Sequence, residues 1–141
     1  RELMEIVTAA ARRQGYEPDC VLCAEDAPRG RPAPYLLYTA AIRLDVYPMQ
    51  SFVKVDDTVV GIEAGRNAGC WTIGITRTGN SLGLSESEVA ALPAEEVDRR
   101  CTAASSAFSA AGAHYIVPSV SEIPELLVEI DRRMARGDLP G

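Results

Sequence analysis

Apolar residues recur along the chain in two alternating patterns, one typical of helices and one typical of strands. Residues 2–14 show the three- and four-residue spacing of an amphipathic helix. Short apolar runs of strand length lie at residues 20–24, 51–56, 70–76 and 114–117. Further helical patterns cover residues 35–44 and 58–68 and begin at Ser85, Pro93 and Ser119. Strands that alternate with helices predict one α/β domain over residues 1–141, with a Rossmann-like parallel sheet covered on both faces.

Two predicted helices carry a recognisable start signal. Ser85 with Glu88, and Ser119 with Glu122, have the spacing of a capping box, in which each side chain bonds the other residue's backbone amide. Pro93 suits the first turn of the helix that follows it, because its missing amide proton costs nothing there.

The composition narrows the function classes. The 141 residues include 14 basic and 20 acidic side chains, a net charge of −6, and 47% are hydrophobic. Without a basic patch, this balance argues against binding nucleic acid or an anionic membrane. No apolar run approaches the roughly 20 residues of a membrane helix, and no signal peptide opens the chain. We therefore expect a cytoplasmic globular protein.

The four cysteines raise the question of a metal or redox site. Cys20 and Cys23 form a C-x-x-C pattern, but on the predicted strand their thiols would point to opposite faces. Zinc would also need a second ligand pair, and the single histidine, His114, lies in another predicted strand. We favour small, buried, reduced cysteines over a zinc site.

Two oddities concern the chain as a whole. Lys54 is the single lysine, beside thirteen arginines. The sequence also begins at Arg1, inside a predicted helix and without an initiator methionine. Together they lead us to expect that these residues form part of a longer protein.

Asp56 and Asp57 close a predicted strand, where ligands bind in open parallel sheets. Adjacent carboxylates suit a hard cation such as Mg²⁺, and at a strand end one would bind it directly and the other through a water. The alternative is that Asp57 only caps the following helix while Asp56 faces solvent. By itself, an Asp-Asp pair favours that alternative.

Arg31 stands in a proline-rich turn before a predicted helix, where a guanidinium and a helix N-terminus would together bind a phosphate. A plain surface arginine is the alternative. Lys54, two residues before Asp56 on the same strand face, is interpreted as a charge partner rather than as an activated amine. His114 is interpreted as structural.

The order of these segments resembles the C-terminal half of the haloacid dehalogenase superfamily core and, within it, the phosphonatase family. The resemblance covers nearly the whole chain and specifically these stretches: Gly-Arg-Pro-Ala-Pro at 30–34, Val-Lys-Val-Asp-Asp-Thr with its glycine-bearing continuation at 53–74, and residues 79–84, 91–94 and 112–115.

The resemblance implies roles for three residues. Arg31 matches the superfamily cation that binds the phosphoryl group and neutralises the nucleophile, and is our candidate catalytic residue. Asp57 and Asp56 match the acidic pair that holds Mg²⁺, with Asp57 as the direct ligand and Asp56 as the water-mediated one. Gly61 departs from some relatives, which have another acid there.

Phosphonatases hydrolyse phosphonoacetaldehyde to acetaldehyde and phosphate, through an imine with a lysine of the cap domain and an aspartyl-phosphate. The resemblance also implies a homodimer, formed largely through the cap. This sequence lacks the motif of the nucleophilic aspartate, and Lys54 does not match the imine-forming lysine. We also expect the central strand of the sheet to be missing between the strands at 20–24 and 51–56, and the chain alone to be inactive.

Two other functions stay open. A related phosphatase or phosphoglucomutase-like enzyme would act on a phosphate ester and would need no imine-forming lysine. A truncated, non-catalytic domain would persist by binding a partner through its open sheet.

Overall fold

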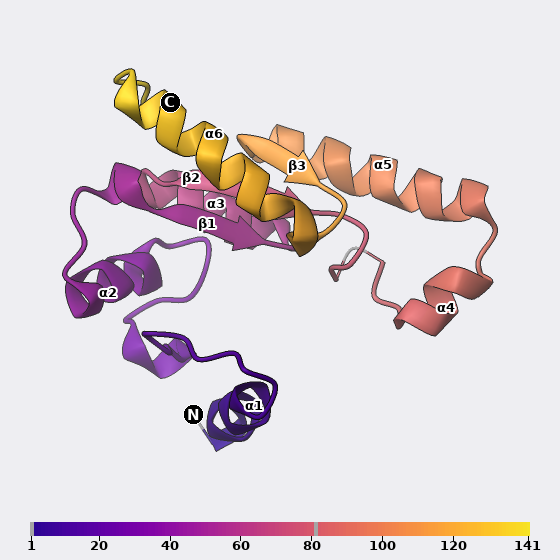
Figure 1. Ribbon diagram of the computed structural model, residues 1–141, viewed down its shortest axis with the longest axis horizontal. Coiled ribbons are helices and arrows are strands. Elements are labelled where there is room, and N and C mark those ends of the chain that lie inside the picture. Colours follow the sequence, from indigo (N-terminus) through magenta and orange to yellow (C-terminus); the bar gives the residue numbers. More distant parts are fainter. Residues whose placement is uncertain (1, 81) are drawn as a thin grey trace.

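A parallel sheet of three strands forms the centre of the molecule (Figure 1). The computed structural model describes residues 2–80 and 82–141. Within them the order is β1-β2-β3, with Val53 paired to Trp71 and Ile73 paired to Tyr115. The strands are β1 (Val53–Asp56), β2 (Trp71–Ile75) and β3 (Tyr115–Val117). The predicted α/β class with a parallel sheet is confirmed.

Helices cover both faces of this sheet. Figure 1 shows α6 on one face and α3 with α5 on the other. The helices are α1 (Glu2–Arg12), α2 (Tyr35–Leu44), α3 (Val59–Ala68), α4 (Glu86–Ala91), α5 (Ala94–Ala110) and α6 (Ile123–Ala135). The α2 helix packs against α3.

Alternation along β2 divides the core between the two faces. Trp71, Ile73 and Ile75 form one buried cluster with Ile130 of α6. On the other face, Gly74 leaves room for Phe108 of α5, because a Cβ at that glycine would lie 2.7 Å from the ring. The aromatic ring thus packs directly on the sheet backbone, which brings α5 close to β2.

Two glycines let α3 lie close to the same face. A Cβ at Gly65 would lie 2.5 Å from a methyl carbon of Thr72 and 2.9 Å from Cγ of Lys54. One turn earlier, a Cβ at Gly61 would overlap the carboxyl group of Asp56. The helix therefore presses against two polar side chains of β1, which fixes where they point.

The strand predicted at residues 20–24 is wrong. This segment is irregular and ends in a 3-10 turn, Ala24–Asp26. Its contacts are with side chains: Arg43 of α2 donates to the carbonyl of Val21 (3.5 Å) and to Asp26 (2.8 Å). A strand needs a neighbour for its backbone groups, and no described strand lies between this segment and β1.

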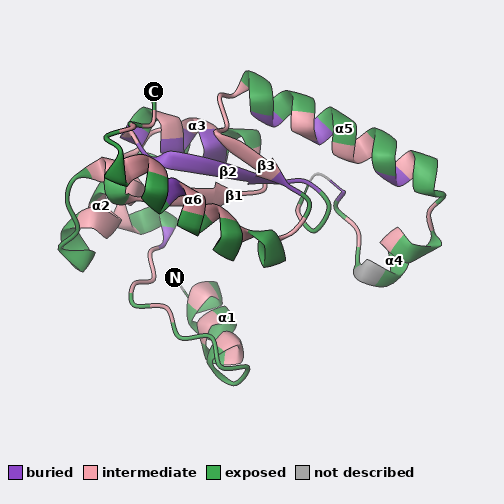
Figure 2. Cartoon of the chain, turned by 45° about the horizontal axis from the view of Figure 1, so that its top comes forward, coloured by how far each residue is buried: buried purple, intermediate pink, exposed green. Residues whose placement is uncertain are grey.

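The N-terminal region is weakly packed. The predicted amphipathic helix is present as α1, but Leu3, Ile6 and Val7 on its apolar stripe are 50–71% exposed. Figures 1 and 2 show α1 set apart from the sheet, on the side of β1. Among the described residues, β1 pairs only with β2, so one edge of the sheet is open.

The helix starts agree with the predictions in part. The capping box of Ser85 and Glu88 is present at α4. Pro93 precedes α5 as its N-cap residue rather than standing in its first turn. The predicted box at Ser119 is wrong: its hydroxyl accepts from the amide of Ser121 (3.3 Å), and a 3-10 turn, Val120–Glu122, comes before α6.

The cysteines are free thiols rather than a cluster. Cys23 and Cys70 are buried, and Cys20 and Cys101 are half-buried. Burial raises the pKa of Cys70 to about 11, with a smaller opposing effect of the Lys54 charge, so its thiol is neutral. Within the described ranges, no helix is both long enough and apolar enough to cross a membrane.

Candidate functional site

The predicted site residues meet where β1 ends and α3 begins. Asp56 is the last residue of β1, and Asp57 follows it. Thr58 caps α3, its hydroxyl accepting a hydrogen bond from the amide of Gly61 (3.2 Å). The alternative in which Asp57 caps this helix is therefore wrong. The positive end of the α3 dipole favours an anion beside these side chains.

The guanidinium of Arg31 reaches the same point from the loop before α2. Its Nη1 donates to Oδ2 of Asp56 and to Oγ1 of Thr58, both at 3.3 Å. The loop is tied to α3 by Asn67, whose side-chain amide donates to the carbonyl of Pro32 (2.9 Å). These hydrogen bonds hold the guanidinium in place. Because 46% of the Arg31 side chain is exposed, the cation still faces solvent.

The Asp56 carboxylate is the most heavily bonded group of the site. It accepts from Nζ of Lys54 (2.6 Å) and from both the amide (2.9 Å) and the hydroxyl (2.6 Å) of Thr58. Burial alone would raise the pKa of Asp56, but these hydrogen bonds outweigh it, so that pKa lies below its ordinary value. Asp56 is therefore an ionised anchor for three neighbouring side chains, Arg31 included.

Lys54 is engaged within β1, as its interpretation as a charge partner predicted. Besides Asp56, its ammonium group donates to the carbonyl of Val55 (3.3 Å). A protonated amine held by a carboxylate is a poor nucleophile. The space that this pair needs comes from Gly61, where any side chain would collide with the Asp56 carboxyl group.

Asp57 has a different environment from Asp56. Its Oδ2 accepts the backbone amide of Asn80 (2.8 Å), from the loop between β2 and α4. Among the described residues, its Oδ1 has no hydrogen-bond partner. Of the two adjacent carboxylates, Asp57 is thus the one with an oxygen open to a ligand.

The donor set at this point suits a hard cation but does not complete its shell. Mg²⁺ takes oxygen ligands, commonly one or two carboxylates together with waters and substrate phosphate oxygens. Nowhere in residues 2–80 and 82–141 do three or more His, Cys, Asp or Glu side chains gather as a metal cluster. Asp57 fits as one ligand, and the remaining ligands must come from elsewhere.

His114 lies at the opposite end of the sheet and has no place in the site. Its Nε2 is 2.7 Å from Nη1 of Arg66, and its Nδ1 is 2.8 Å from the hydroxyl of Thr72. The backbone amide of Thr72 also donates to Nδ1 (2.9 Å). The ring also packs at a tilt on Trp71, over which Arg133 stacks at 4.5 Å. The interpretation of His114 as structural agrees with these contacts.

Acid is expected to destabilise the protein through His114. Burial, with Arg66 and Arg133 nearby, lowers the pKa of His114 from 6.5 to about 4. Between those values the unfolded chain binds a proton that the folded chain excludes, so the free energy of unfolding falls as pH drops from 6.5 to 4. Urea unfolding across this window tests it: His114→Gln should show a shallower pH dependence, and an unchanged slope would contradict the assignment.

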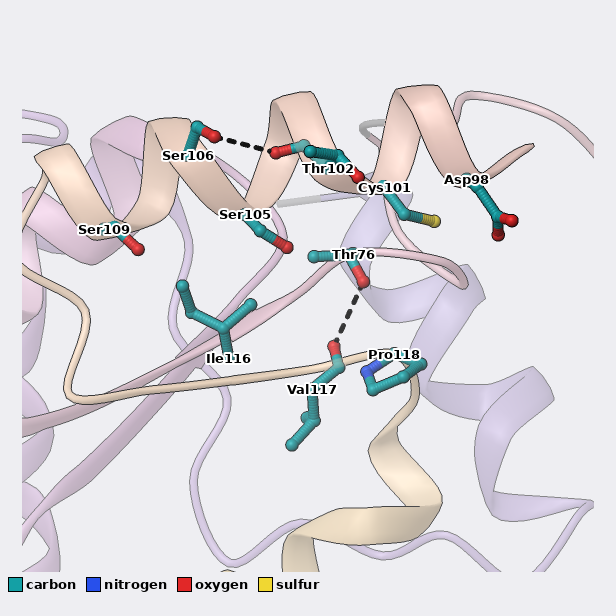
Figure 3. A pocket seen from close by; sticks show the side chains of 10 residues that line it. All are labelled: Thr76, Asp98, Cys101, Thr102, Ser105, Ser106, Ser109, Ile116, Val117 and Pro118. Atoms are coloured by element: carbon teal, nitrogen blue, oxygen red, sulfur yellow. Dashed lines mark hydrogen bonds between the residues drawn. The ribbon is translucent and has the colours of Figure 1, made fainter. Parts of the chain in front are cut away.

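Away from this site, a hollow lies between α5, the end of β3 and the residues that follow β2 and β3 (Figure 3). It has a volume of about 710 Å³, and four of its ten lining residues are serines and a threonine of α5. Two of its hydroxyls already donate to backbone carbonyls, Ser106 to Thr102 (3.0 Å) and Thr76 to Val117 (3.4 Å). The residues that line this hollow include no Lys or Arg that could bind an anionic substrate.

Sequence reasoning missed three contributors to the site. Thr58 bonds both Asp56 and Arg31, Asn67 fixes the Arg31 loop, and the amide of Asn80 holds Asp57. A helix-cap signal at Thr58 was present in the sequence, directly after the acidic pair. Asn67 and Asn80 contact residues 35 and 23 positions away in the sequence, and a local sequence pattern does not predict such contacts.

Known proteins share this sequence and fold. The chain is 44% identical over 138 residues to a phosphonoacetaldehyde hydrolase of Syntrophobacter fumaroxidans, and 45% identical over 138 residues to one of Nitratidesulfovibrio vulgaris. Each match covers 98% of this chain. The chain is homologous to phosphonoacetaldehyde hydrolases. No family model matches it.

A phosphonoacetaldehyde hydrolase-like protein of Oleispira antarctica has the same fold, with a TM-score of 0.90 and 38% identity over 94% of this chain. This confirms the expected haloacid dehalogenase-type core over the part that the chain covers. The chain spans about half the length of the phosphonoacetaldehyde hydrolases that it matches, 50% and 49% in the two named above. It also covers 48% of the solved structure.

Proposed function

We propose that this chain is the C-terminal half of a Mg²⁺-dependent phosphonoacetaldehyde hydrolase. The observation that carries the proposal is the position of a fixed but exposed Arg31 guanidinium, bonded to Asp56, beside Asp57, which has one oxygen without a described partner, at the N-terminus of α3. Negative charge grows on the phosphoryl oxygens during transfer, and a guanidinium and a bound metal ion together stabilise that charge.

Arg31 would bind the phosphoryl oxygens and orient them. Because Asp56 and Thr58 hold its Nη1, the guanidinium loses little conformational entropy when a substrate binds. The exposed part of the fork, together with the α3 dipole, would attract the dianionic phosphonate head group.

Asp57 would hold Mg²⁺ through Oδ1, and that cation would supply charge stabilisation for the transferring phosphoryl group. Asp56 as a water-mediated contact to the cation stays a prediction. Its carboxylate has a second task in the structure, which is to hold Lys54, Thr58 and Arg31 in place.

The remaining chemistry would belong to the preceding half. There we expect the nucleophilic aspartate that takes the phosphoryl group, the lysine that forms an imine with the aldehyde, and the strand that fills the open edge of β1. The resemblance further supports a cytoplasmic homodimer acting on a small molecule.

The test is a pair of assays on the full-length protein, the chain joined to the coding sequence before it. Incubation with phosphonoacetaldehyde and Mg²⁺ should release acetaldehyde and phosphate in equal amounts. Borohydride added during turnover should trap a covalent adduct on a lysine outside residues 1–141. Phosphate release from phosphate esters without any trapped adduct would instead indicate the phosphatase or phosphoglucomutase-like alternative.

The open edge of β1 and the exposed stripe of α1 favour a second function, a non-catalytic domain that persists by binding a partner. Under that alternative, the coding sequence before this chain supplies no nucleophilic aspartate. The purified chain would then self-associate and show no turnover. Monomeric sedimentation with cooperative unfolding would count against it.

A further inference from the structure

The loop between β2 and α4, residues 76–85, makes a contact that the proposed chemistry has not used. It is anchored at its start, where the carbonyl of Pro118 accepts from the amides of Arg77 (2.9 Å) and Thr78 (3.2 Å). It is anchored again at Leu82, which is buried. Between these anchors, Gly79 and the backbone amide of Asn80 lie against Asp57.

Two features of the loop act on Asp57. The amide of Asn80 donates to Oδ2 of Asp57 at 2.8 Å. Gly79 packs so closely that a Cβ there would overlap Cβ of Asp57 and lie 3.0 Å from the carbonyl of Ile75. The backbone of Gly79 is not in the left-handed region, so the glycine is required for space rather than for its dihedral angle.

The consequence for the carboxylate is directional. A hydrogen bond to Oδ2 and backbone contact at Cβ together restrict rotation of the Asp57 side chain, while no described residue donates a hydrogen bond to Oδ1. A cation ligand fixed in this way loses less entropy on binding and accepts charge on one defined oxygen.

We propose that Gly79 and the backbone amide of Asn80 are positioning elements of the cation site, which set the orientation of the Asp57 carboxylate. This inference rests on the proposed function, in which Asp57 is a Mg²⁺ ligand. It predicts that the peptide N–H matters at position 80, while the asparagine side chain does not.

A matched pair of variants separates the role of the peptide N–H from that of the asparagine side chain. Asn80→Ala keeps the amide and Asn80→Pro removes it. In the full-length protein, Mn²⁺ titration followed by electron paramagnetic resonance should show near-wild-type affinity for Asn80→Ala and a loss of about tenfold for Asn80→Pro, the range found for outer-shell partners of metal ligands. Equal affinity of Asn80→Pro and wild type would overturn the proposal, as would an equal loss in Asn80→Ala.

A second pair of variants tests the proposal in case Asn80→Pro disrupts folding. Gly79→Ala should also weaken Mn²⁺ binding by about tenfold. Gly30→Ala is the control, since nothing lies within 4 Å of a Cβ there, and should bind as wild type does. If Asn80→Pro does not melt cooperatively, Gly79→Ala decides, and wild-type affinity in that variant overturns the proposal.

Asp57→Asn distinguishes this inference from the function on which it rests. If wild-type protein binds Mn²⁺ and Asp57→Asn does not, the proposed metal role holds, and the loop variants alone judge the inference. If Asp57→Asn binds Mn²⁺ as tightly as wild type, the metal role of Asp57 fails and the inference falls with it.

Discussion

Replacing Arg31 by alanine is expected to lower kcat/KM of the full-length protein for phosphonoacetaldehyde by on the order of 10³-fold, the lower end of the range for arginines that stabilise phosphoryl transfer. The guanidinium is the described cation that combines anchoring by Asp56 and Thr58 with an exposed face. Phosphate release in a continuous assay measures the effect.

The fold should survive this change, because Asp56 keeps its bonds from Lys54 and from Thr58. The melting temperature should therefore move little. Arg29→Ala is the matched control, a loop arginine two residues away that is exposed and should leave the rate unaffected. Rates near wild type for Arg31→Ala would refute the assigned role.

Asp57→Asn is expected to reduce Mg²⁺-dependent turnover on the order of 10³-fold, since loss of a metal ligand removes several kcal/mol of charge stabilisation, at about 1.4 kcal/mol for each factor of ten. The substitution is nearly isosteric, and the Asn80 amide can still donate to the oxygen of the new side chain. The carboxylate charge is thus removed with little change in shape.

The measurement is the rate as a function of Mg²⁺ concentration. Asp131→Asn, on the exposed surface of α6, is the control for loss of one negative charge far from the site. If Asp57→Asn retains the wild-type rate and the wild-type Mg²⁺ dependence, Asp57 is not a ligand. Asp56→Asn should differ from it by also loosening Arg31, and so by raising KM for the phosphonate.

Much of the fold follows from local pattern. The runs that became β1, β2 and β3 are apolar and bounded by polar or glycine positions, and the parallel arrangement follows from the helices between them. The run at 20–24 has the same local pattern and is not a strand. Strand formation depends on a pairing neighbour, and a neighbour is a property of the whole sheet rather than of five residues.

The site shows the same division between local and distant information. Arg31, Asp56 and Asp57 are candidates by type and position, their roles follow from the resemblance, and the structure brings all three to the start of α3. The bonding difference between the two aspartates could not be predicted, since it depends on Gly61 leaving space for one and on the distant Asn80 bonding the other. Adjacent, chemically identical residues thus acquire separate tasks from tertiary contacts.

The open edge of β1 has a consequence for synthesis. In the proposed two-part protein, the half before Arg1 leaves the ribosome first, and its edge strand has no parallel partner until Val53–Asp56 has been translated. Pairing between segments so far apart in sequence is slow, because a long loop must close before any contact forms. Formation of this one strand pair is therefore expected to be a late and slow step in the folding of the proposed protein.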